Sequence, residues 1–78
     1  MTLETENIMF TRKDVTKIDD LIRANDANAG NGGYGGITTV RISEITMINN
    51  RIVIEILLLL SEMGIIFEQY PNIWRYLR

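Results

Sequence analysis

The stretch "NNRIVIEILLLLSEMG", residues 49–64, decides how the rest of the chain is interpreted. Its two ends are polar, and every residue from Ile52 to Leu60 is apolar except Glu55. Such a run fits a membrane anchor, a buried strand, or a helix that is covered on more than one side. Each of these possibilities predicts a different kind of protein.

A membrane anchor is the least consistent with the sequence. The apolar run is much shorter than the roughly 20 residues that span a bilayer, and the acidic Glu55 lies inside it. Residues 1–10, "MTLETENIMF", are acidic and lack the basic region and apolar stretch of a signal peptide. We therefore expect a cytoplasmic protein with no membrane partner.

The choice between helix and strand rests on the second half of the run. Leu57 to Leu60 show no alternation of polar and apolar residues and favour a helix, and Gly64 is the glycine that commonly follows a helix end. Asn49 or Asn50 can cap the helix start. The alternative makes residues 37–48 and 51–59 two strands joined at Asn49-Asn50, because Ile and Val favour strands. The sequence predicts the helix.

Composition limits what a chain of this size can do. The 78 residues predict one small domain, which needs a disulfide, a metal or a partner subunit for added stability. There is no Cys and no His, so the thiolate ligand, the imidazole ligand and the commonest general base are all missing. We expect no enzyme, no metal and no other cofactor, and we expect self-association. A net charge of −2 gives no overall attraction to nucleic acid.

The segment before the apolar run predicts a first helix from Thr11. Thr11 and Asp14 have the spacing of a capping box, and Asn25 and Asp26 are expected to end the helix. The inward positions, spaced by three and four residues, are Val15, Ile18, Leu21 and Ile22.

Residues 30–36 contain five glycines. The string Gly30-x-Gly32-x-x-Gly35 matches a dinucleotide-binding fingerprint, but that fingerprint requires a strand before it and a helix directly after it. Here a predicted helix precedes the glycines. The stretch therefore predicts a flexible connection.

The rest of the chain predicts a second, short helix and a hairpin. Thr38 or Thr39 can cap a helix whose inward residues are Val40, Ile42 and Ile45. After Gly64, residues 65–69 and 73–77 are rich in β-branched and aromatic side chains. They are separated by Tyr70-Pro71-Asn72, which places Pro71 in a turn.

This order of elements over residues 11–78 resembles the winged helix-turn-helix family, with residues 1–10 as an N-terminal arm. The resemblance implies an α+β fold, mostly α, with three helices followed by a short β-hairpin wing. Two departures are Met47, where a glycine is common, and the shortness of the wing. The residues that carry the resemblance are Ile42-Ser43, Ile48, Asn49, Gly64-Ile65-Ile66 and Arg75-Tyr76-Leu77.

In this family the second helix of the motif enters the major groove of DNA with its first residues at the base edges. The resemblance assigns that role to Asn49, Asn50 and Arg51, which suit adenine and guanine. Three other roles stay open: Asn49 as a helix cap only, Arg51 paired with Glu55, and Arg75 as a solvated strand residue.

Contacts to the DNA backbone are expected on two further elements. The start of the second helix offers Thr38, Thr39 and Arg41 as phosphate contacts. The wing offers Arg75 and Arg78, which would reach an adjacent minor groove or backbone.

The third helix has more apolar surface than one small domain can cover. On a helical wheel, the core side is expected to hold Val53, Ile56, Leu57, Leu60 and Met63, and the opposite side a polar stripe of Arg51, Glu55 and Glu62. Ile52 and Leu59 flank the stripe on one edge, and Ile54 and Leu58 flank it on the other. A helix that is apolar nearly all round is buried nearly all round. We therefore assign Ile52, Ile54, Leu58 and Leu59 to a dimer interface.

Within the fold family, this arrangement resembles TubR, the centromere-binding adaptors of tubulin-type (type III) plasmid and phage partition systems. The resemblance implies a homodimer that binds repeated, centromere-like sites in double-stranded DNA, with a tubulin-like GTPase as partner and possible repression of its own operon. Two alternatives stay open. One is an ordinary winged-helix transcriptional regulator that dimerises elsewhere, and the other is a winged-helix protein-interaction module without DNA binding, which the acidic balance favours.

Overall fold

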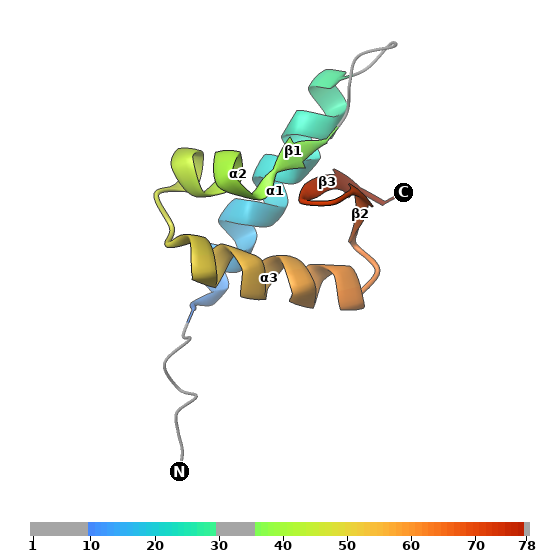
Figure 1. Cartoon of the computed structure of the whole chain (residues 1–78). Coiled ribbons are helices and arrows are strands. Elements are labelled where there is room, and N and C mark those ends of the chain that lie inside the picture. Colours follow the sequence, from blue (N-terminus) through green and yellow to red (C-terminus); the bar gives the residue numbers. More distant parts are fainter. Residues whose placement is uncertain (1–9, 30–35, 78) are drawn as a thin grey trace.

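The computed structural model describes residues 10–29 and 36–77, and over these residues the chain is α+β and mostly helical (Figure 1). The strand alternative for residues 37–48 and 51–59 is wrong, because both segments are largely helical. Residues 1–9 of the predicted arm, residues 30–35 of the glycine-rich connection, and Arg78 lie outside the described residues. The elements are α1 (Arg12–Ala29), β1 (Ile37–Thr38), α2 (Thr39–Thr46), α3 (Asn50–Glu62), β2 (Ile66–Tyr70) and β3 (Ile73–Tyr76).

The start of α1 has the predicted capping box. The Thr11 N–H donates to Asp14 Oδ2 and the Asp14 N–H donates to Thr11 Oγ1, each over 3.2 Å. The predicted end of this helix is wrong, since α1 continues through Asn25 and Asp26 to Ala29. Asp26 does not end the helix because its carboxylate is buried and bonded to Arg75, a residue far away in sequence.

Both predicted ends of α3 are confirmed. The Asn49 Oδ1 atom caps the helix by accepting the Arg51 N–H at 2.8 Å. At the other end, the Ile65 N–H donates to the Leu60 carbonyl and the Gly64 N–H to the Ser61 carbonyl, both at 3.0 Å. This pair of bonds is the Schellman motif, and Gly64 has the positive φ of 75° that it requires.

The turn between α2 and α3 is held by side chains. Met47 has φ 63° and ψ 24°, a left-handed conformation that favours glycine. Thr46 Oγ1 donates to the Ile42 carbonyl at 2.7 Å and accepts the Ile48 N–H at 3.3 Å. Ser43 Oγ donates to the Ile48 carbonyl at 2.6 Å. These bonds fix the turn despite the methionine.

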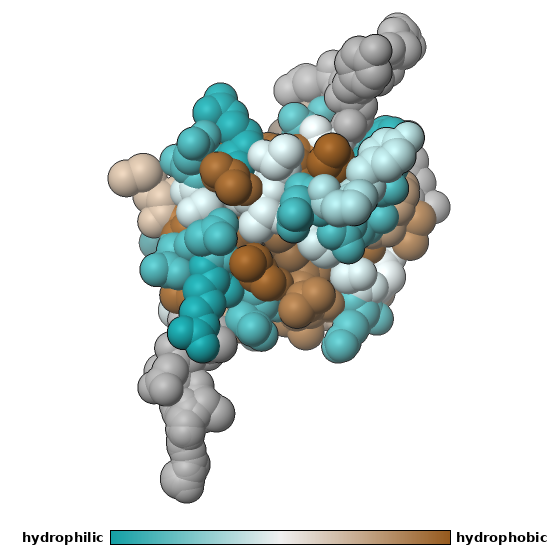
Figure 2. Space-filling model, viewed as in Figure 1, coloured by the Kyte–Doolittle hydropathy of each residue, from teal (hydrophilic) through white to brown (hydrophobic). Residues whose placement is uncertain are grey.

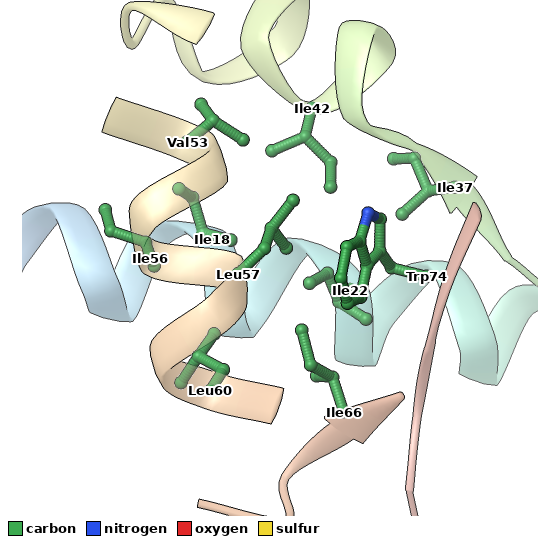
Figure 3. Packing of buried hydrophobic residues seen from close by; sticks show 10 residues of the cluster. All are labelled: Ile18, Ile22, Ile37, Ile42, Val53, Ile56, Leu57, Leu60, Ile66 and Trp74. Carbon is green, nitrogen blue, oxygen red and sulfur yellow. The ribbon is translucent and has the colours of Figure 1, made fainter. Parts of the chain in front are cut away.

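One hydrophobic core joins the helices to the sheet (Figure 3). Side chains from α1, α3 and the strands point toward one another around Leu57 and Trp74. The buried apolar residues are Ile18, Ile22, Ile37, Ile42, Val53, Ile56, Leu57, Leu60, Ile66 and Trp74.

Three residues predicted to face inward are exposed instead. On α2, Val40 and Ile45 are exposed, while Ile42 is buried with Thr39 and Thr46. Residues 39, 42 and 46 share one side of a helix at 100° per residue, so an eight-residue helix that buries them turns Val40 outward. Met63 is exposed because it is the C-cap of α3 and lies beyond the last core position, Leu60.

The strands form an antiparallel sheet in the order β1-β3-β2. In the β2–β3 hairpin, Ile66 is paired with Tyr76 and Glu68 with Trp74, and Pro71-Asn72 make the turn, so the predicted hairpin is confirmed. β1 pairs Ile37 with Trp74. This strand was not predicted because its two residues are too short to show an alternating pattern.

Gly36 directly precedes β1 and packs closely against β3. Its φ is +102°, and a Cβ at this position would lie 2.6 Å from Ile73 Cγ2. Only a residue without a side chain lets β1 approach β3 so closely. Of residues 30–36, predicted as a flexible connection, Gly36 is the one within the described range, and it packs against β3.

Replacing Gly36 should cost more stability than replacing Gly64, which also has positive φ but has nothing within 4 Å of a new Cβ. We expect Gly64→Ala to lower the free energy of unfolding by about 1–2 kcal/mol through backbone strain alone. Gly36→Ala should lose about 1–3 kcal/mol more, because the methyl overpacks against Ile73. Urea unfolding followed by Trp74 fluorescence measures both. Equal losses would contradict a tight β1–β3 contact.

Candidate nucleic-acid interface

The start of α3 presents polar side chains to solvent. Asn49, Asn50 and Arg51 are all exposed. The alternative role of Asn49 as a cap is confirmed for its Oδ1 atom. The alternative pair of Arg51 with Glu55 does not form, since the ion pairs over residues 10–29 and 36–77 are Arg23–Asp19, Arg41–Glu44 and Arg75–Asp26. Asn50 and Arg51 therefore offer an amide and a guanidinium group without an intramolecular ion pair.

The two threonines at the start of α2 have different surroundings. Thr38 is the exposed N-cap, and its Oγ1 accepts the Arg41 N–H at 3.1 Å. Thr39 is only 5% exposed, and its Oγ1 accepts the Trp74 Nε1–H at 3.0 Å. The Thr39 backbone N–H also donates, to the Asn72 carbonyl at 3.1 Å. Thr39 is committed to the fold, so we correct its assignment as a phosphate contact.

Arg41 remains accessible at the surface. Its Nη1 lies 3.4 Å from Glu44 Oε1, and both side chains are more than half exposed. Exposed ion pairs of this kind contribute only about 0–1 kcal/mol, so a phosphate can replace the carboxylate at little cost.

Arg75 is engaged in an ion pair inside the domain. Its Nε donates to Asp26 Oδ1 at 2.8 Å, and the side chains of Arg75 and Asp26 are 31% and 4% exposed. This bond joins β3 to α1 and neutralises a buried carboxylate. One residue on, the Tyr76 ring has the Arg23 guanidinium carbon 4.8 Å from its centroid. Arg75 is thus neither a solvated strand residue nor a free phosphate contact.

The outer face of α3 carries apolar side chains on both edges of its polar stripe, Ile54 and Leu58 on one edge and Leu59 on the other. These three residues are called the apolar strip below. Ile54 is 41% exposed and Leu58 50% exposed, while Leu59 is half-buried. Figure 2 shows apolar side chains over the middle of α3 with hydrophilic ones around them. Ile52, which we had assigned to the same interface, is half-buried against the core and belongs mainly to the fold.

Residues within the described ranges line two of the surface hollows. One, of about 300 Å³, adjoins the apolar strip and is lined by Phe10, Glu55, Leu58, Leu59 and Glu62. The other, of about 500 Å³, lies between α1, β1 and α2, and its lining includes Leu21, Ala24, Ile37, Arg41 and Ile45. Over the described residues, no group of three or more Asp, Glu, His or Cys side chains is placed to hold a metal ion.

Within the described part of the chain, none of the helices has the length and apolar character needed to cross a bilayer. Comparison with protein families, with characterised proteins and with solved structures gives no match.

The Arg75–Asp26 bond predicts a specific pattern of stabilities. Arg75→Ala should lower the free energy of unfolding by about 1–3 kcal/mol, because it removes the guanidinium from a buried carboxylate. Adding Asp26→Asn should recover part of this loss, since the remaining side chain no longer carries the buried charge. Arg41 and Glu44 form an exposed ion pair and serve as the control. Arg41→Ala and Glu44→Ala should each change the free energy of unfolding by less than about 1 kcal/mol. Urea unfolding of the single and double variants measures the coupling, and simple additivity of Arg75→Ala and Asp26→Asn would contradict it.

Proposed function

We propose that this protein is a winged helix-turn-helix that binds double-stranded DNA as a homodimer. In this proposal α3 is the recognition helix and the β2–β3 hairpin is the wing. The order of helices, the side-chain-bonded turn before Asn49 and the β1-β3-β2 sheet support it. The observation that carries it is the division of α3 into an exposed polar start and an exposed apolar strip.

The polar start of α3 suits base recognition. An Asn amide can form two hydrogen bonds with adenine and an Arg guanidinium two with guanine in the major groove. Asn50 and Arg51 provide these groups in the first turn, where a recognition helix meets the bases. Thr38 and Arg41 at the start of α2 suit phosphate contacts, which set the position of the helix on the duplex.

The apolar strip suits a second copy of the chain. A domain of this size leaves little room to bury more of its own surface, and Ile54 and Leu58 are left exposed on a helix of 13 residues. Arg51, Glu55 and Glu62 lie between Leu58 and Leu59 on the helical wheel, so the interface would hold polar groups beside its apolar ones. Two α3 helices packed in this way would present two polar starts to one stretch of DNA.

The resemblance to TubR extends the proposal to a biological role. A dimer built on its recognition helices suits a centromere-binding adaptor of a plasmid or phage partition system, with a tubulin-like GTPase as partner. Repeated sites would allow dimers to line up along the DNA, and binding at such sites could also repress the operon. The ordinary transcriptional regulator differs in dimerising through another surface.

A second candidate is a winged-helix module that binds protein and not DNA. The net charge of −2 favours it, and so does the engagement of Arg75 by Asp26, which removes one cation from the wing. Steep dependence of duplex binding on salt concentration separates the two candidates, because phosphate neutralisation releases counterions.

Arg51 should carry sequence specificity. We expect Arg51→Ala to weaken binding to a specific duplex by about 1–3 kcal/mol, with a smaller effect on a random duplex, since a bidentate base contact is lost. Arg41→Ala should weaken binding to both duplexes alike and lower the slope of log affinity against log salt by about one. Fluorescence anisotropy with both duplexes measures these effects. If neither variant differs from the parent, the DNA surface lies elsewhere or does not exist.

Leu58 should carry the dimer. Leu58→Glu would place a charge in a desolvated interface, which costs several kcal/mol, so we expect the dimer to dissociate. DNA affinity should fall at the same time, because the α3 starts of the two subunits no longer bind one duplex together. The control is Val40→Glu, which alters a residue that is 61% exposed on α2, outside the strip, and should leave the dimer intact. Light scattering and a DNA titration test this. A Leu58→Glu protein that stays dimeric and keeps its affinity would favour the ordinary regulator.

A further inference from the structure

The basic residues of this chain fall into two groups, those in ion pairs with a carboxylate of the same chain and those outside such pairs. Arg23, Arg41 and Arg75 each have a carboxylate partner. Over residues 10–29 and 36–77, the cations outside these ion pairs are Arg12, Lys13, Lys17 and Arg51. Three of these four lie in the first two turns of α1, a segment that sequence reasoning had assigned to the fold alone.

The arrangement of these three side chains is unfavourable for the isolated fold. Arg12, Lys13 and Lys17 are all exposed. Lys13 and Lys17 are four residues apart on the side of α1 opposite the buried Ile18, and like charges at this spacing destabilise a helix by about 0.2–0.5 kcal/mol. Asp14, beside Lys13, already accepts the Thr11 N–H in the capping box, and Asp20, three residues after Lys17, forms no ion pair with it. An external anion would relieve this repulsion.

The start of α1 lies beside the face of α3 that carries Arg51. Phe10, two residues before Arg12, lines the same hollow as Glu55, Leu58, Leu59 and Glu62 of α3. Arg51 is one helical turn before Glu55 and so lies on the same side of α3. Figure 1 shows the start of α1 emerging next to α3. A polyanion that runs along this side of α3 toward Arg51 would contact both the start of α1 and the start of α3.

We propose that Arg12, Lys13 and Lys17 form a second DNA contact, to the phosphates of the duplex whose bases meet Asn50 and Arg51. This inference rests on the proposed function and adds a surface to it. Lys13 and Lys17 are about 6 Å apart along the helix axis, so the pair can reach neighbouring phosphates of one DNA strand. The contact supplies affinity without sequence preference, because phosphates are the same at every base pair.

The chemistry of this face favours DNA over an anionic membrane. A helix that lies on a membrane needs apolar side chains beside its cations, so that they can enter the lipid. The exposed residues around Lys13 and Lys17 are Arg12, Thr16 and Asp20, which are all polar or charged. A rigid row of phosphates fits this surface, and a lipid interior does not.

The test neutralises the two lysines with Lys13→Gln/Lys17→Gln, since glutamine keeps a high helix propensity. Each lost phosphate contact lowers the salt slope by about 0.9, so the double variant should lose about two and bind roughly 10- to 60-fold more weakly at 0.1 M salt. Specific and random duplexes should be affected alike. The charge-preserving Lys13→Arg/Lys17→Arg variant should keep the parent slope.

A control separates a local contact from an effect of net charge. Ala27→Glu/Met63→Glu makes the same change in net charge at two exposed positions, on the last part of α1 and at the end of α3. It should alter the salt slope much less than the lysine variant. Melting temperatures of all the variants, measured in parallel, show that each remains folded.

The outcomes distinguish this inference from the proposed function. If the parent protein shows no salt-dependent duplex binding, both are overturned. If the parent binds and Arg51→Ala weakens specific binding while Lys13→Gln/Lys17→Gln keeps the parent slope, only the α1 contact is overturned. Equal losses in the lysine variant and the control also overturn it. So does a lysine variant that loses binding to phosphatidylserine vesicles but retains its affinity for DNA.

Discussion

The hydrogen bond from the buried Trp74 indole to Thr39 holds the arrangement of the elements together. Trp74 lies in the central strand of the sheet, faces Ile37 of β1 across the ladder, and donates to the first residue of α2. A buried indole N–H without a partner would be costly, so this bond specifies where α2 begins relative to the hairpin. The Thr39 N–H bond to the Asn72 carbonyl adds a second link between the same two elements. Because the short turn after α2 leads directly to Asn49, the position of the α3 start relative to the hairpin depends on this contact.

The parts of the fold that could be predicted from sequence are those with a local cause. The capping box at Thr11, the Asn49 cap and the Gly64 motif each involve residues within a few positions of one another, and all three form as expected. The end of α1, the two-residue strand β1 and the fixed conformation of Gly36 depend on partners far along the chain. Asp26 and Arg75, for example, are 49 positions apart. Single-sequence patterns carry no signal for such pairings.

The same distinction applies to the candidate site. A motif indicates which residue types occupy the expected positions, but only packing decides which of them remain available. Thr39 and Arg75 matched the expected positions and are used by the core and by α1. Arg12, Lys13 and Lys17 matched no motif, and the structure draws attention to them because, among the described residues, Arg51 is the one other cation outside the ion pairs. A signal was present in the sequence, since Lys13 and Lys17 repeat at a one-turn spacing without an acid between them on that side.

Under the proposed function, dimerisation and DNA binding are linked through one rigid helix. The apolar strip and Arg51 both belong to α3. Packing two strips against each other therefore also fixes the separation and orientation of the two α3 starts. Once one α3 start is bound, the α3 start of the second subunit binds at a high effective concentration. The affinity of the dimer for DNA then rises without any new kind of contact. Each subunit nevertheless carries a net charge of −2, which repels DNA as a whole. Attraction must therefore come from cations held close to the phosphates, and it will be strong only where two subunits bring their α1 and α3 starts to one duplex together. An acidic protein built in this way would bind DNA tightly as a dimer and weakly as a monomer, so its own concentration would control occupancy of the site.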